Sequence, residues 1–381
     1  MKVHITLVGG QPAPVYHGII ATDPDLVVYV YSSQSKKALL RLESEVKVPY
    51  EHQEPLDATD PFEIMHRAID LAEKYKDDEV TLNISSGLKS WSHLFGKVFE
   101  LMPNASVVYM DQNNVLWNYR TMQSSDNFVF NMDTLFRLQG NGLEHYTPFT
   151  DYTDDDFKSM QTVEQARNYQ TADFNALTTV LPKAWSAQLT SQKSGRFEKD
   201  NEVFAEWEKG KFVRLSLKTK KYGIQEFYAE SPHAVEIAFN SGWFEYKVAR
   251  MLSHWHYATD IRLNCVFPPI SEKDKNIAEK FPKNEVDVIM NTGKKILFVE
   301  CKTKINNSTD IDKFRTVVKN YGGMGSKALF ITLEPMTKTQ MEKCAESSIT
   351  YFSLKDPDFG PNKEQELFKL LESFLFNIND K

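Results

Sequence analysis

The sequence predicts an α/β protein with at least two sheets, and three observations support this expectation. The N-terminal third alternates short apolar runs with amphipathic segments of helical length. The acidic segment Asp151–Asp156 interrupts this alternation. Further along, two strongly apolar runs flank Asn291-Thr292-Gly293, a typical hairpin turn. With 381 residues, the chain is long enough for about two domains of ordinary size.

In the N-terminal part, apolar runs predict four buried strands, at Val3–Val8, Leu26–Tyr31, Val80–Ile84 and Ala105–Met110. Helical spacing predicts helices over Phe62–Tyr75 and Trp91–Met102. Strands that alternate with helices of this length favour a parallel sheet covered by helices. The segment Val115–Tyr119 follows an Asn113-Asn114 turn and can add an antiparallel strand at the edge.

The middle of the chain is expected to be mostly helical. Residues from Phe157 to about Pro182 and Val203–Trp207 have helical patterns, whereas Phe212–Leu217 and Gln225–Ala229 can form a hairpin around Tyr222-Gly223. We therefore expect three regions. They are an N-terminal domain over residues 1–145, a mostly helical connection over 146–235 and a C-terminal domain over 236–381.

The C-terminal part is expected to be a second α/β unit that begins with an amphipathic helix, Gly242–Trp255. Further helices are predicted over Asp310–Tyr321, Met336–Ala345 and Lys363–Phe376. Apolar runs predict strands at Ile261–Phe267, Glu285–Met290, Lys295–Cys301, Ala328–Thr332 and Thr350–Ser353.

The composition is that of an ordinary globular protein without a disulfide framework. Apolar residues make up 41% and charged residues 25% of the chain, as in ordinary globular proteins. Three widely separated cysteines argue against a disulfide framework and against a paired-cysteine zinc site. The sequence has no signal-peptide pattern and no apolar run long enough to cross a membrane, so a cytoplasmic location is expected. A net charge of −7 counts mildly against nucleic-acid binding, although a local basic surface can act within an acidic protein.

Charged residues interrupt the two apolar strands of the predicted C-terminal hairpin. Alternate residues of a strand share a face, so Glu285 and Asp287 are expected to point one way while Val286 and Val288 point the other. Glu300 and Lys302 likewise share a face, with Cys301 opposite. A short hairpin can bring Asp287 next to Glu300, which places two carboxylates and an amine together.

This arrangement suits phosphodiester hydrolysis. Two carboxylates can hold Mg²⁺ or Mn²⁺, and the cation polarises a phosphoryl oxygen and lowers the pKa of a bound water. Lys302 can then orient the water or stabilise the charge that builds on the phosphate. The alternative is a solvated sheet face with cross-strand ion pairs, which is the usual role of such residues in a strand.

The order of these features resembles the PD-(D/E)xK restriction-endonuclease-like superfamily. The matching positions are Glu245 in the preceding helix, Asp287, and Glu300-Cys301-Lys302. The resemblance implies that Asp287 and Glu300 bind the metal, helped by the backbone carbonyl of Cys301, and that Glu245 and Lys302 complete the catalytic set. Val286 stands where the superfamily's name has proline, a frequent departure.

Two turns in the N-terminal part follow the carboxyl ends of predicted parallel strands. One contains Gly10 and Gln11, and the other contains Ser85, Ser86, Gly87 and Lys89. Open α/β sheets bind ligands at this edge, and the free N–H groups of a helix start favour phosphate. Neither turn matches a dinucleotide or P-loop motif. Taken alone, Ser-Ser-Gly is more often an ordinary helix cap.

Together, LVGGQPAP and NISSGLK resemble the CRISPR-associated Rossmann-fold (CARF) sensor domain. The likeness covers about residues 1–140 and 235–355 and points to the CARF nucleases that act beside type III CRISPR systems. It implies a homodimer that binds a cyclic oligoadenylate, most often cyclic tetra-adenylate, through Gly10, Gln11, Ser85, Ser86, Gly87 and Lys89. It also implies cleavage of DNA, and in some members of single-stranded RNA, with no membrane partner.

Two other functions remain open at this stage. One is a non-catalytic sensor that regulates by binding nucleic acid, and the presence of Asp287, Glu300 and Lys302 argues against it. The other is a repair or restriction nuclease whose N-terminal domain serves only dimerisation or DNA contact. Dependence on a cyclic nucleotide separates this last function from the first.

Overall fold

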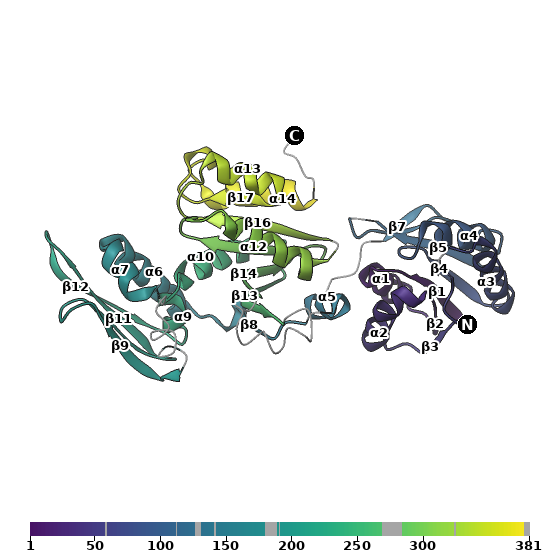
Figure 1. Cartoon of the computed structure of the whole chain (residues 1–381), viewed down its shortest axis with the longest axis horizontal. Coiled ribbons are helices and arrows are strands. Elements are labelled where there is room, and N and C mark those ends of the chain that lie inside the picture. The colour runs from purple at the N-terminus through teal and green to yellow at the C-terminus, as the bar shows by residue number, and fades with distance from the viewer. Residues whose placement is uncertain are drawn as a thin grey trace.

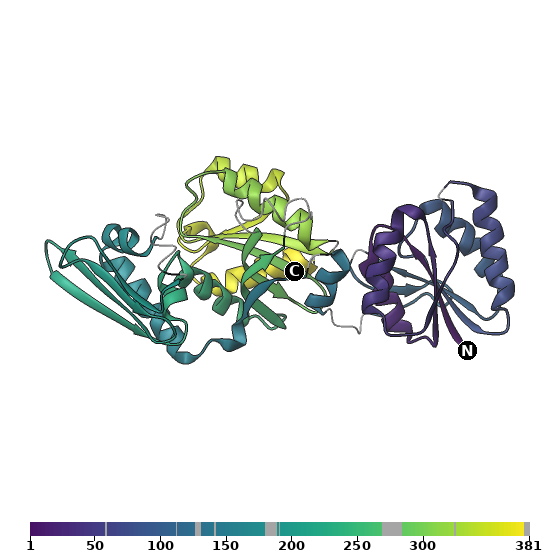
Figure 2. The ribbon, with the colours of Figure 1, turned by 60° about the horizontal axis from the view of Figure 1, so that its bottom comes forward.

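The computed structural model describes residues 1–57, 59–111, 113–125, 131–140, 142–179, 189, 191–268, 284–323 and 325–376. Three sheets lie in a row along the long axis of the molecule, with the C-terminal sheet between the other two (Figures 1 and 2). The α/β fold class expected from the sequence is confirmed, with a Rossmann-like N-terminal unit and a second α/β unit at the C-terminal end.

The N-terminal sheet has the strand order β3-β2-β1-β4-β5-β6-β7. Its first five strands are parallel and the last two are antiparallel, as expected for the edge after Asn113-Asn114. The strands are β1 (Lys2–Val8), β2 (Leu26–Tyr31), β3 (Tyr50–His52), β4 (Glu79–Asn83), β5 (Ala105–Met110), β6 (Leu116–Asn118) and β7 (Gln123–Ser125).

Helices cover both faces of this sheet and bury its apolar side chains. One face packs against α1 (Pro12–Thr22) and α2 (Lys36–Glu45), and the other against α3 (Pro61–Lys74) and α4 (Lys89–Phe99). Strands covered on both faces read as continuous apolar runs, which is why the sequence showed them clearly. The helix expected over Phe62–Tyr75 begins one residue earlier because the Asp60 carboxylate caps it and Pro61 fits its first position.

The middle segment corrects the expectation of a mostly helical connection. Helices α6 (Asp154–Tyr169) and α7 (Thr171–Thr178) are present, and the end of the predicted helical stretch lies outside the described residues. They are followed by an antiparallel sheet of order β12-β11-β10-β9. Its strands are β9 (Ser194–Glu198), β10 (Phe204–Glu208), β11 (Phe212–Thr219) and β12 (Gly223–Glu230), and the short helix α9 (Ala234–Ala238) comes next.

The segment Val203–Trp207 is therefore a strand and not a helix, whereas the hairpin around Tyr222-Gly223 is confirmed as β11 and β12. Packing decides the difference, because Trp207 is 1% exposed and lies against Phe197 with ring centroids 4.5 Å apart. These contacts join residues of neighbouring strands, so the pattern of the local sequence does not predict them.

The C-terminal sheet has the order β17-β16-β15-β14-β13-β8. Its strands are β8 (His145–Pro148), β13 (Asp260–Phe267), β14 (Asn284–Asn291), β15 (Ile296–Lys302), β16 (Ser326–Thr332) and β17 (Thr350–Ser353). One face packs against α10 (Gly242–Ser253) and α14 (Lys363–Phe376). The other packs against α5 (Met132–Gln139), α12 (Thr309–Val317), the π-helical turn η4 (Val318–Gly322) and α13 (Lys338–Glu346).

Helix α5 lies between the N-terminal and C-terminal units (Figure 1). Its residues Met132, Leu135 and Phe136 belong to the core beneath the C-terminal sheet, although the sequence suggested an N-terminal domain up to residue 145. That boundary remains a prediction. Across the described residues, no helix has the length and apolar character needed to cross a membrane.

Candidate active site

The hairpin of β14 and β15 brings the predicted catalytic residues together at the point where the two strands separate. Paired residues run from Asn291↔Ile296 to Val288↔Val299, and the ladder stops there. Beyond this point a side chain replaces the backbone as hydrogen-bond acceptor, because Asp287 Oδ2 accepts the Cys301 N–H at 2.7 Å. Asp287 and Glu300 therefore lie on either side of the opening, as the hairpin predicted.

The expected alternation of faces is wrong at this point. Val286 packs in the core beneath α12, whereas Val288 packs in the core beneath α10. The physical reason is the interruption of the ladder at Asp287, since regular alternation needs a regular strand. The alternation of side chains expected from the sequence thus breaks at Asp287, a candidate catalytic residue. Departures from sequence patterns are expected at functional sites.

Lys302 joins the two carboxylates. Its Nζ lies 2.7 Å from Glu300 Oε1 and 3.4 Å from Asp287 Oδ2. The side chains of Asp287 and Glu300 are 12% and 15% exposed, whereas Lys302 is 35% exposed. Two nearly buried carboxylates thus share one ammonium group that reaches toward solvent.

Burial and mutual repulsion shift the titration of these groups. Burial, with the charge of Asp287 next to it, raises the pKa of Glu300 to about 8. The same two causes, in the same order, raise the pKa of Glu245 on α10 well above its usual range. Burial alone would lower the pKa of Lys302, but the charges of Asp287 and Glu300 raise it above the ordinary lysine value. The site thus brings three carboxyl groups together with one lysine.

This excess of carboxyl groups over lysine fits a divalent cation. A cation beside Asp287 and Glu300 would favour their ionised forms and relieve the repulsion that raises the pKa of Glu300. In the described part of the chain, no group of three or more His, Cys, Asp or Glu side chains forms a ready metal site. Mg²⁺ is commonly held by one or two carboxylates, with water and substrate phosphate completing its shell, so two carboxylates suffice.

Cys301 was predicted to contribute only its backbone. Its thiol is buried, and burial raises its pKa well above the usual cysteine range, so it is a poor nucleophile. Its N–H orients Asp287. Metal binding by its carbonyl stays a prediction.

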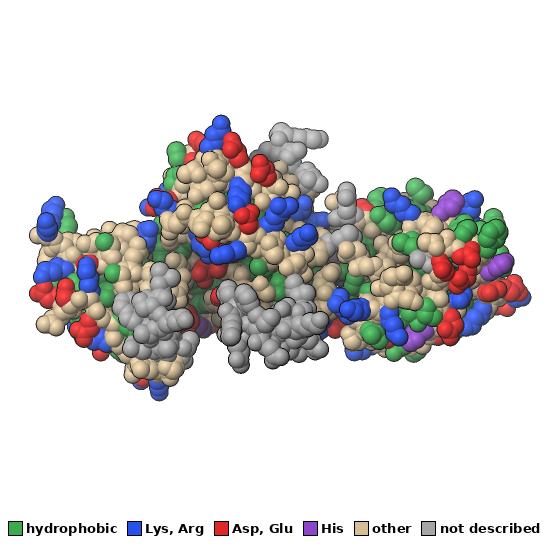
Figure 3. All heavy atoms as spheres, viewed as in Figure 1, with side chains coloured by type: hydrophobic (Ala, Val, Ile, Leu, Met, Phe, Trp, Pro, Cys, Tyr) green, Lys and Arg blue, Asp and Glu red, His purple; other side chains and the backbone are tan. Residues whose placement is uncertain are grey.

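A basic surface lies near the hairpin despite the acidic net charge. Figure 3 shows Lys and Arg side chains gathered over α12 on the face that it presents. Lys313, Arg315 and Lys319, on α12 and η4, are exposed. The charge of Asp310, in the first turn of α12, reaches Glu300 and helps to raise its pKa, so this helix begins beside the candidate site.

The predicted ligand residues of the N-terminal unit lie at the carboxyl ends of two neighbouring strands, β1 and β4. The turns after these strands touch, since the Gly9 N–H donates to Ser86 Oγ at 3.1 Å. A side chain at Gly9 would collide with the Gly87 backbone nitrogen, at 2.5 Å, so the close approach requires glycine. Gly87 itself has φ +83°, the left-handed region that favours glycine.

The six predicted residues differ in their surroundings. Gln11 Oε1 is buried and has no hydrogen-bond partner among the described residues, so it is free to accept from a ligand. Gly10 is exposed beside it. Lys89 is exposed at the first position of α4, where, within the described chain, it makes no hydrogen bond or ion pair with the other five.

Ser85 is tied to the core of the unit. Its Oγ donates to Asn83 Oδ1 at 2.5 Å and accepts the Met110 N–H, at the end of β5, at 2.8 Å. Sequence reasoning did not single out Asn83 or the residues after Met110. The signal for them is weak, because an Asn at a strand end and an Asp before Asn-Asn usually mark turns.

No protein-family model matches the sequence, and no match was found among curated proteins. Among solved structures, Can2 from Sulfobacillus thermosulfidooxidans in complex with cyclic tetra-adenylate is similar over 98% of this chain and 99% of its own, with a TM-score of 0.66 and 16% identity. This chain shares its fold. The protein VC1899 from Vibrio cholerae has a TM-score of 0.72 and 16% identity over 98% of each chain.

A third similar structure is described as a type III CRISPR defence DNA nuclease activated by cyclic oligoadenylate. It has a TM-score of 0.56 and 15% identity, and the match covers 97% of this chain but 51% of that one. The α/β fold expected from the sequence, with two α/β units, is therefore shared with these solved structures. At these identities the likeness concerns fold, and function must be argued from the sites.

Proposed function

We propose that the chain is a metal-dependent nuclease that cyclic oligoadenylate activates in type III CRISPR defence. The observation that supports this most is the meeting of Asp287, Glu300 and Lys302 where the β14–β15 ladder opens. A solvated sheet face would leave these groups exposed, and instead both carboxylates are nearly buried and the pKa of Glu300 is raised by burial and by the Asp287 charge. DNA is the proposed substrate, and single-stranded RNA is a second substrate to be tested.

In the proposed reaction, Asp287, Glu300 and the Cys301 carbonyl would hold Mg²⁺ or Mn²⁺. The cation, when bound, would supply Lewis acidity and a water of lowered pKa. Asp287 is positioned for this by the Cys301 N–H. Lys302 stays protonated because its pKa is raised, so it can stabilise the charge that develops on phosphate. Glu245 adds a further carboxyl whose raised pKa lets it hold a proton near Asp287.

The activator is proposed to bind at the turns after β1 and β4, with cyclic tetra-adenylate as the first candidate. Gln11 offers an unpaired acceptor, and the glycines of both turns let backbone N–H groups approach a phosphate closely. The similar fold of Can2, solved with cyclic tetra-adenylate, supports this choice of ligand. A ring of repeated units suits a two-fold interface, so a homodimer is part of the proposal.

The test is a cleavage assay on plasmid DNA, single-stranded DNA and RNA with Mg²⁺ or Mn²⁺. Each reaction is run with no activator and with cyclic tri-, tetra- and hexa-adenylate, beside Lys302→Ala. We expect cleavage only with cyclic tetra-adenylate and a loss of at least about 100-fold in Lys302→Ala, the scale of losing one stabilising group. Cleavage without activator would support the ligand-independent nuclease. Ligand binding with no cleavage under any condition would support the non-catalytic regulator.

A further inference from the structure

We infer that the turn between β5 and β6, through its residues Asp111, Asn113, Asn114 and Val115, couples the candidate ligand-binding turns after β1 and β4 to the active-site hairpin. These four residues are called the relay turn. The inference rests on the proposed function, because it concerns how the proposed activator would reach the proposed nuclease site. Met110, which precedes the relay turn, is hydrogen-bonded to a candidate ligand residue, and Asn114 of the relay turn is hydrogen-bonded to the turn of the active-site hairpin.

The relay turn begins next to a residue that contacts the candidate ligand-binding turn after β4. Met110, the residue before it, donates its N–H to Ser85 Oγ at 2.8 Å. Ser85 lies in the turn after β4, beside Ser86 and Gly87. A ligand that draws the Ser85 hydroxyl toward itself would therefore act on the backbone of the residue adjoining the relay turn.

The relay turn is stiff enough to transmit a displacement. The Asp111 carboxylate accepts the N–H groups of Asn113 and Val115, at 2.8 and 3.0 Å, and the Trp117 indole N–H at 3.3 Å. The Asp111 backbone carbonyl accepts the Asn114 N–H at 3.0 Å. One carboxylate thus holds three donors, so the turn should move as a unit.

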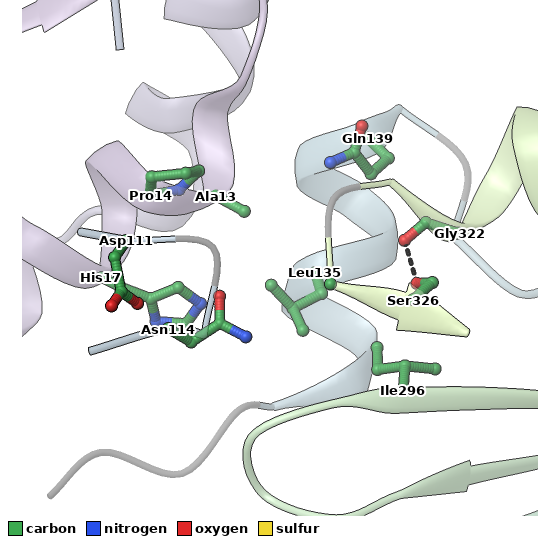
Figure 4. Close-up of a pocket in the computed structure, with 11 residues that line it drawn as sticks. Ala13, Pro14, His17, Asp111, Asn114, Leu135, Gln139, Ile296, Gly322 and Ser326 are labelled. Atoms are coloured by element: carbon green, nitrogen blue, oxygen red, sulfur yellow. Dashed lines mark hydrogen bonds between the residues drawn. The ribbon is translucent and has the colours of Figure 1, made fainter. Parts of the chain in front are cut away.

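The tip of the relay turn contacts the nuclease hairpin. Asn114 Nδ2 donates to the Lys294 carbonyl at 2.6 Å, across 180 positions of sequence. On its other side, a Cβ at Gly325 would lie 3.2 Å from the same nitrogen, so Asn114 is seated between the hairpin turn and the start of β16. In Figure 4 the Asn114 side chain points from the N-terminal unit toward Ile296 and Leu135.

The contacted hairpin leads directly to the candidate catalytic residues. Its turn is closed by Thr292, whose N–H donates to the Lys295 carbonyl at 3.0 Å and whose Oγ1 accepts the Lys295 N–H at 2.9 Å. From Asn291 the paired strands extend to Asp287 and Glu300. At ~3.3 Å per residue, the catalytic pair lies roughly 13 Å from the turn, so a tilt of the hairpin would move it.

Open space flanks the relay turn and permits such movement. On one side a cavity of about 120 Å³ is lined by Asp111, Asn114, Gln139 and Ser326, among others (Figure 4). On the other side a cavity of about 370 Å³ is lined by Asn113, Val115, Thr292 and Lys295, among others. Close-packed interfaces resist small displacements, whereas a contact with space on both sides can shift.

Helix α5 supplies a fixed pivot next to the relay turn. Arg137 binds both oxygens of Glu45 on α2, at 2.7 and 2.9 Å. At the other end of α5, the Asp133 carboxylate accepts from both terminal nitrogens of Arg262 on β13, one of them at 2.9 Å. Because the two units are held together here, a displacement of the candidate ligand-binding turns would, in the proposed coupling, tilt the units relative to each other at the relay turn.

The test compares three substitutions in the full-length protein with cyclic tetra-adenylate as the ligand. Asn114→Asp keeps the shape and the tolerance for φ +61° but cannot donate to Lys294, and Asn114→Gly removes the side chain while keeping that tolerance. Asn113→Asp is the matched control, since it makes the same charge change at an exposed neighbour. Ligand affinity, cleavage with and without ligand, and hydrogen–deuterium exchange of residues 284–302 are measured.

We expect all variants to bind cyclic tetra-adenylate as the wild type does. In the wild type and Asn113→Asp, ligand should change exchange in the hairpin. In both Asn114 variants that change should be lost and the activation ratio should fall about tenfold, a typical size for coupling between sites. Equal activation and an equal exchange response in all variants would overturn the relay and leave the proposed function intact. Failure of the wild type to bind ligand would overturn both. Normal binding and exchange with no cleavage would support the relay and overturn only the nuclease.

Discussion

At the scale of single residues, the main feature of the candidate active site is that its ionisable side chains are largely buried. Glu300 is 15% exposed and faces Asp287 across a shared lysine. Its pKa rises to about 8 through burial first and the Asp287 charge second. A carboxyl with such a pKa binds a proton in the folded state at neutral pH and must lose it to bind a cation, so metal and proton compete for the site.

This competition predicts a pH dependence that Glu300→Gln should remove. Folded Glu300 keeps its proton up to pH of about 8 while the unfolded carboxyl loses it near its ordinary pKa of 4.5. The stability contributed by the protonated group is therefore complete below about pH 4.5 and is lost as pH rises toward 8. Thermal melts with a chelator should show wild type losing stability relative to Glu300→Gln over this window, and Mg²⁺ should reduce the loss. A difference between the two proteins that stays constant with pH would contradict the assignment.

At the scale of elements, two glycines in helices are predicted to respond in opposite directions to alanine. Gly242 begins α10, and a Cβ there would lie 1.9 Å from the Glu236 backbone carbonyl oxygen. Gly242→Ala must push α10 away from α9, so it should cost roughly 2–4 kcal/mol of unfolding free energy, as other severe packing errors do. It should also lower cleavage, because Glu245 lies one turn along the same helix.

Gly96 in α4 is the matched control, because a Cβ there meets nothing within 4 Å. Gly96→Ala should stabilise the protein by about 0.5–1 kcal/mol, since alanine favours helix more than glycine does. Chemical denaturation of both variants measures whether the unfolding free energy falls or rises in each. Destabilisation of similar size at both positions would show that helix propensity, and not the Gly242 contact, decides the outcome.

Most elements of the two α/β units could be predicted, because each strand or helix carries its own periodic signal. β2 is a continuous apolar run, and α3 has a cap, a proline and an apolar stripe. β10 could not be predicted in this way. It reads as helical, and only the packing of Trp207 against Phe197 makes it a strand.

At the scale of the whole molecule, α5 joins the N-terminal and C-terminal units, and its end on the C-terminal side is a buried ion pair. Arg262 is 9% exposed and pairs with Asp133 and with Asp260. Removing one partner leaves the nearly buried Arg262 guanidinium with one carboxylate in place of two. This destabilises the folded protein more than the loss of an exposed ion pair does. The contact is also long-range, so it affects how the two units unfold together.

Asp133→Asn is therefore expected to lower the unfolding free energy by about 1–2 kcal/mol, less than for a fully buried pair because Asp133 is 35% exposed and Asp260 remains. Asp155→Asn, which breaks an exposed pair with Lys158, should change it by less than about 0.5 kcal/mol. Calorimetry should also show broader or separated transitions in the first variant only. Equal, small effects would mean that α5 does not hold the two units together.

The sequence by itself determined the two α/β units, the hairpin at Asn291-Thr292-Gly293, and the residues Asp287, Glu300 and Lys302 as a group. These features depend on spacing within short segments, where period and turn chemistry act directly. Only the tertiary structure decided the middle sheet, the break in alternation at Asp287, and the contact of Asn114 with Lys294. Those features depend on contacts between segments far apart in the chain, and such contacts leave no periodic pattern in the local sequence.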